Sequence, residues 1–62
     1  MTRDLYAAAR VAAASLIHNA EKFPCDATKL VAINTIQAYQ RIGLFGDGYA
    51  TRLINYVEGL KR

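Results

Sequence analysis

The sequence predicts an all-α fold, a compact three-helix bundle that associates with itself. Apolar residues recur every three or four positions along three stretches, and the alternation typical of a strand is missing. Two breaks separate these stretches, one at Pro24 and one at a glycine cluster in residues 43–48. A chain of 62 residues has room for one domain, which we expect to span residues 1–62.

The first helix is expected over residues 3–22. Thr2 is a suitable N-cap, and Asp4 lies in the first turn, where the helix dipole favours a carboxylate. At 100° per residue one side is apolar and rich in alanine, which gives high helix propensity and a shallow face. That side comprises Leu5, Ala9, Ala12, Ala13, Leu16, Ala20 and Phe23, with Tyr6 and Ile17 at its border.

The second helix is expected over residues 27–42, after a break at Pro24 and with Asp26 as its N-cap. Its apolar side comprises Ala32, Ile36, Tyr39 and Ile42, flanked by Val31 and Ala38. The opposite, polar side is narrow, because Leu30 and Ile33 lie at its edges. A helix that is apolar around most of its circumference is usually buried on more than one side. Two short neighbours leave part of it uncovered, which indicates a partner.

The third helix is expected over residues 48–60, with Asp47 as its N-cap. One face carries Tyr49, Leu53, Tyr56, Val57 and Leu60, and the other carries Thr51, Arg52, Asn55, Glu58 and Arg62. In the preceding loop, Gly43 is expected to be the left-handed C′ residue of the second helix. Two interpretations remain for the apolar pair Leu44–Phe45. Either it folds back to close the core, or Phe45 stays exposed and inserts into a partner.

Composition also indicates self-association. Small domains often need a disulfide, a metal ion or a second copy for stability. One cysteine, Cys25, excludes an internal disulfide, and one histidine, His18, leaves too few ligands for structural zinc. The apolar fraction of 53% is high for so short a chain. A second copy is therefore the stabiliser that remains.

The sequence gives little support for catalysis, a metal site or a membrane segment. A nucleophilic triad needs a histidine beside a nucleophile and an acid, and only His18, Cys25 and Asp26 are available, in a chain too short for a cleft. We expect no enzyme activity, no metal, no cofactor and no small-molecule substrate. The longest uncharged stretch is too short to span a bilayer. The lone cysteine suits a reducing compartment, so we expect a soluble, cytoplasmic protein.

Two functions remain for a helical chain without a chemical site. The first is a small protein-binding regulator that occupies a partner surface as a homodimer, through Leu30, Ile33, Gln37 and Phe45. Short helical chains that begin with methionine are often accessory regulators of bacteria or phages. The alternative is a nucleic-acid-binding regulator that reads bases with the third helix, through Thr51, Arg52, Asn55 and Arg62. The net charge of +3 is spread evenly along the chain, which disfavours the alternative.

Overall fold

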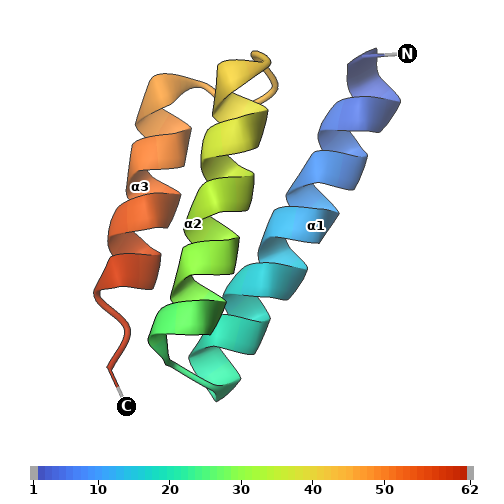
Figure 1. Cartoon of the computed structure of the whole chain (residues 1–62). Coiled ribbons are helices and arrows are strands. Elements are labelled where there is room, and N and C mark those ends of the chain that lie inside the picture. The colour runs from blue at the N-terminus through green and yellow to red at the C-terminus, as the bar shows by residue number, and fades with distance from the viewer. Residues whose placement is uncertain (1, 62) are drawn as a thin grey trace.

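The chain forms a bundle of three helices in a computed structural model that describes residues 2–61, and side chains from Asp4 onward. The helices are α1 (Thr2–Lys22), α2 (Asp26–Arg41) and α3 (Asp47–Glu58). Figure 1 shows α2 between the other two, with each helix antiparallel to the one before it. α1 and α3 contact each other much less than each contacts α2. The predicted all-α three-helix architecture is confirmed.

The helix boundaries differ from the predicted ones by one or two residues. α2 starts at Asp26 rather than after it, because Cys25 is the N-cap and the Thr28 hydroxyl accepts a hydrogen bond from the Cys25 N–H (3.2 Å). α3 starts at Asp47 with Gly46 as its N-cap, so the N-cap predicted at Asp47 is wrong. The Asp47 carboxylate accepts a hydrogen bond from the Gln40 side-chain amide (2.9 Å). The cap predicted at Thr2 depends on a side chain outside the described part of the chain.

The connection between α2 and α3 closes the end of α2 in the predicted way. Gly43 has φ +88°, the left-handed conformation expected of a C′ residue. The Leu44 N–H donates to the carbonyl of Tyr39 (2.9 Å), and the Gly43 N–H donates to that of Gln40 (3.1 Å). These two bonds define a Schellman motif, which directs the chain after Gly43 back toward the core.

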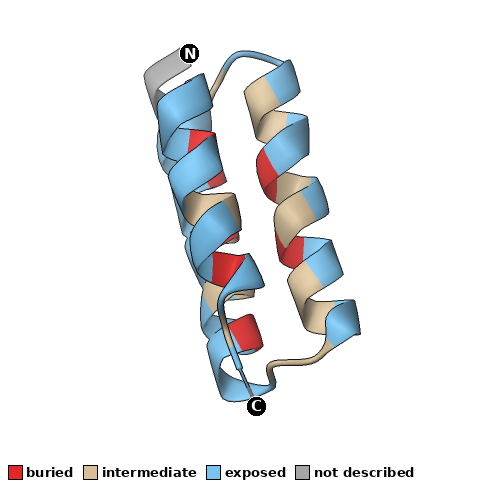
Figure 2. Cartoon of the chain, turned by 90° about the vertical axis from the view of Figure 1, so that its left-hand side faces the viewer, coloured by how far each residue is buried: buried red, intermediate tan, exposed pale blue. Residues whose placement is uncertain are grey.

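The core is small and made largely of alanine. Five of the eight fully buried side chains are alanines, and the large ones are Ile36, Phe45 and Val57. Figure 2 shows that the buried positions lie on the sides of the helices that face one another. Because alanine removes little apolar area from water, such a core stabilises the bundle only modestly.

Candidate functional site

Among the described residues, more large apolar side chains are exposed than are fully buried. The exposed ones are Leu5, Tyr6, Val11, Phe23, Leu30, Val31, Ile42, Tyr49 and Tyr56. The accessible surface is 4439 Å², compared with the roughly 4,000 Å² expected for a folded monomer of 6.8 kDa. The exposed large apolar side chains, rather than the total area, make the apolar surface the candidate functional feature.

Leu30, one of these exposed apolar residues, lies among polar residues on the solvent side of α2. Leu30, Asn34, Gln37 and Arg41 follow one another at spacings of four, three and four, and all are exposed, Leu30 by 58%. We call these four residues the outer α2 surface. Ile33 lies at its edge, is half-buried and packs against the core cluster. Of the predicted interface residues, Leu30 and Gln37 are therefore accessible, whereas Ile33 also serves the core.

The interface role predicted for Phe45 is wrong for this conformation, because Phe45 is only 2% exposed. Its ring makes edge-on contacts with Tyr6 of α1, Tyr39 of α2 and Tyr49 of α3, at centroid distances of 6.3, 5.4 and 5.0 Å. The other interpretation of the loop, in which Leu44–Phe45 closes the core, is confirmed. Phe45 links all three helices at one end of the bundle.

Among the large residues on the predicted apolar sides of the helices, three are more than half exposed: Leu5 by 59%, Phe23 by 63% and Ile42 by 69%. Leu5 lies in the first turns of α1, where this helix leans away from α2 (Figure 1). Phe23 and Ile42 each lie just beyond the end of a helix. Helical periodicity places such residues on the apolar side but carries no information about where the neighbouring helix ends.

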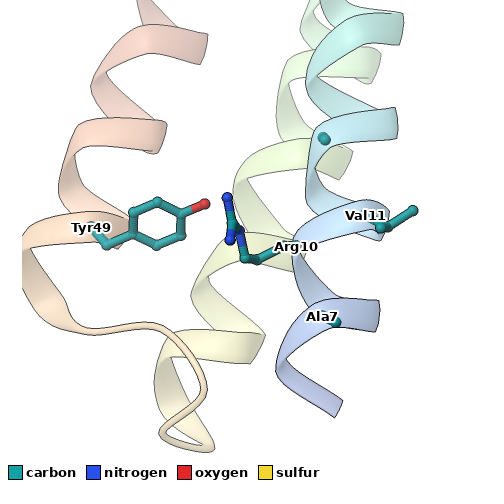
Figure 3. Close-up of a pocket in the computed structure, with 5 residues that line it drawn as sticks. Ala7, Arg10, Val11 and Tyr49 are labelled. Carbon is teal, nitrogen blue, oxygen red and sulfur yellow. The ribbon is translucent and has the colours of Figure 1, made fainter. Parts of the chain in front are cut away.

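A shallow groove lies between the N-terminal half of α1 and the start of α3. It is lined by Ala7, Arg10, Val11, Ala14 and Tyr49. Figure 3 shows the Arg10 guanidinium and the Tyr49 hydroxyl pointing toward each other across it, and Val11 pointing away. The guanidinium carbon of Arg10 also lies 5.7 Å from the centre of the Tyr6 ring, within the range of a cation–π contact. Arg10 thus partly covers this groove.

The residues of the alternative nucleic-acid hypothesis lie on the solvent side of α3. Thr51, Arg52 and Asn55 are exposed, and Glu58 shares their side of the helix. Arg62 lies outside the described residues. The described part of this face therefore carries one positive and one negative charge, so it offers little net attraction for phosphate.

The residues considered for chemistry contact near neighbours in the sequence. The side chain of His18 is 70% exposed, and its Nδ1 atom lies 3.6 Å from Oε1 of Glu21. The two side chains form an ion pair when the imidazole is protonated. The thiol of Cys25 lies 3.6 Å from the hydroxyl of Thr28. Within residues 2–61 no three His, Cys, Asp or Glu side chains lie close enough together to hold a metal ion. Nor does any described helix have the length and apolar character needed to cross a membrane.

α1 and α3 are also joined by a polar contact, in which the Tyr56 hydroxyl donates a hydrogen bond to the Glu21 carboxylate. This hydrogen bond is the main cause that raises the pKa of Tyr56 above its ordinary value of 10.0, with smaller contributions from desolvation and from the negative charge of Glu21. The neutral phenol is therefore the form that the folded state favours.

We expect Tyr56→Phe to lower the melting temperature at neutral pH. Because the folded-state pKa lies above the unfolded value, the stabilisation by Tyr56 is fully present below about pH 10 and is lost as the pH rises through the folded-state pKa. Thermal melts of both proteins between pH 7 and pH 11 should therefore converge at the alkaline end. A difference that stays constant up to pH 11 would contradict this assignment of the hydrogen bond.

Comparison with known proteins gave no match: no protein-family model, curated protein or solved structure is significantly similar to this chain. The function must therefore be argued from the surface itself.

Proposed function

We propose that this chain is a small, non-enzymatic regulator that binds another protein and acts by sterically occupying part of its surface, as a homodimer in the cytoplasm. The observation that carries this proposal is the exposure of nine large apolar side chains around a core built mainly from alanine. Large exposed apolar surface marks interaction sites in folded proteins. The proposal needs no cofactor, metal ion or small-molecule substrate.

The outer α2 surface is the part that we propose for the partner. Leu30 supplies an apolar anchor, while Gln37 and Arg41 supply a polar rim, which is the usual composition of a protein interface. α2 is held to the segment 47–60 near both ends of this surface. Lys29 donates a hydrogen bond to the Leu60 carbonyl, and Gln40 donates one to Asp47. A rigid helix loses little conformational entropy when a groove or flat surface accepts it.

The proposed function predicts that Leu30→Glu abolishes partner binding without unfolding the chain, because Leu30 is 58% exposed. The wild-type protein and its variants would be immobilised and exposed to an extract of the source cells. Val11→Glu is the matched control, since Val11 is 67% exposed and lies on a different helix. We expect one protein to be retained in stoichiometric amount by the wild type and by Val11→Glu, but not by Leu30→Glu.

Two outcomes would contradict this function. Retention of the same protein by Leu30→Glu would remove the outer α2 surface from the interface. Retention of DNA or RNA instead, released by salt and lost in Arg52→Ala, would favour the nucleic-acid-binding alternative.

A further inference from the structure

We infer that a second copy of this chain docks on the side of α1 and α2 that faces away from α3. This inference rests on the self-association in the proposed function and assigns it to a surface separate from the outer α2 surface. We call the new surface the α1–α2 face. It comprises Leu5, Ala8 and Ala12 of α1, Val31 and Ala38 of α2, and Ile42 at the end of α2.

The position of this face on α2 follows from the contacts that α2 makes with α3. Lys29 and Gln40 both donate hydrogen bonds to the segment 47–60, so their side of α2 faces α3. Val31 comes two positions after Lys29, and Ile42 comes two positions after Gln40. Two positions correspond to about 200° around a helix. Val31 and Ile42 therefore lie on the side opposite α3, where they are 50% and 69% exposed.

The same reasoning places the α1 part of the face. Tyr6 contacts Phe45, and Arg10 lines the groove shared with Tyr49 of α3, so both lie on the side of α1 near α3. Ala8 comes two positions after Tyr6, and Ala12 comes two positions after Arg10. They consequently lie on the side of α1 opposite α3. Leu5 belongs to the same stripe, since it comes three positions before Ala8.

The absence of charge on this face favours a second copy over an unrelated partner. None of its six residues is ionisable, although the chain carries 13 ionised Lys, Arg, Asp and Glu side chains in all. In a two-fold symmetric contact the same patch meets itself, so any charge within it would approach its own copy. An uncharged patch avoids this repulsion and the cost of burying charge. The outer α2 surface, in contrast, contains Arg41.

The side of the molecule that carries this face has room for a small dimer interface. The Cα trace measures 38 × 18 × 14 Å, so the whole of a long side has a footprint of roughly 500–700 Å², which is below the 800 Å² per partner of a standard interface and near the lower limit for stable ones. The alanines let the second pair of helices approach closely, as in a four-helix bundle. Leu5, Val31 and Ile42 supply the large side chains that would interdigitate there.

Sedimentation equilibrium of the wild type over a range of concentrations, with Val31→Glu and Thr51→Glu as a matched pair, tests this assignment. Thr51 is exposed on the solvent side of α3, away from the α1–α2 face. We expect the wild type and Thr51→Glu to form dimers, and Val31→Glu to raise the dimer dissociation constant at least about tenfold, because it brings like charges together. Leu30→Glu is a second control, since its side chain lies one position away on the outer α2 surface. Circular dichroism would verify that each variant remains helical, and Ala38→Glu provides a second charged probe of the face.

A wild type that stays monomeric at all concentrations would overturn the inference. So would a dimer that survives both Val31→Glu and Ala38→Glu, or one that Leu30→Glu dissociates as strongly. These outcomes of sedimentation test the dimer alone. The proposed partner binding is tested separately, by whether the wild type and Leu30→Glu capture a partner protein. A monomer that still binds its partner through Leu30 would refute the dimer alone.

Discussion

Phe45→Ala is expected to cost about 3–5 kcal/mol of folding free energy, the range for removing a buried aromatic side chain. A domain of this size has a total stability of roughly 3–9 kcal/mol. If the total stability lies in the lower half of this range, as the alanine-rich core suggests, the substitution should leave much of the population unfolded at 25 °C. The reason is local: Phe45 is the one ring that contacts Tyr6, Tyr39 and Tyr49, which come from three different helices. Few other large side chains are buried in this core, so little can compensate for the loss.

The matched control for this prediction is Phe23→Ala, because Phe23 is 63% exposed. We expect it to change the free energy of unfolding by less than about 0.5 kcal/mol. Urea titrations followed by circular dichroism, at one protein concentration, would measure both variants. Equal losses for the two variants, or a larger loss for Phe23→Ala, would contradict the placement of Phe45 in the core.

The three helices and the way α2 ends could be predicted from local signals. Apolar spacing, Pro24 and the glycine cluster gave the number of helices and their approximate ranges. Gly43 gave the left-handed turn, because few other residues adopt that conformation without strain. Each of these signals depends on a few neighbouring residues, so no knowledge of the tertiary arrangement was needed.

The division between core and surface could be predicted less well. Ile42 and Val31 lie beside Ala32 and Ile36 in the predicted apolar arc, yet the first pair is exposed and the second is buried. The difference depends on where α1 and α3 pack against α2, which periodicity along α2 does not record. Phe45 shows the opposite case, since no helical pattern covers a loop residue. Its burial was one of two interpretations that followed from the Gly43 cap, and the contacts with three tyrosines decide between them.

Gly43→Ala is expected to destabilise the fold by about 1–2 kcal/mol, the cost of holding an L-residue in the left-handed region. Gly43 has φ +88°, and an added Cβ would meet no atom within 4 Å, so the cost comes from the backbone alone. If the chain relaxes to avoid that strain, the Schellman hydrogen bonds from Gly43 and Leu44 are weakened and Phe45 is displaced from its ring contacts. The loop therefore couples a local backbone requirement to the packing of the whole bundle.

Gly48→Ala provides the comparison that separates backbone strain from the general effect of removing a glycine. Gly48 lies in the first turn of α3 without a positive φ, and an added Cβ would also meet nothing within 4 Å. Replacing a helical glycine by alanine usually stabilises by up to about 1 kcal/mol, so the two variants should move the urea midpoint in opposite directions. Asparagine at position 43 should retain part of the stability, because it tolerates the left-handed region better than alanine. Midpoints that rise in both alanine variants would show that the Gly43 turn does not hold Phe45 in place.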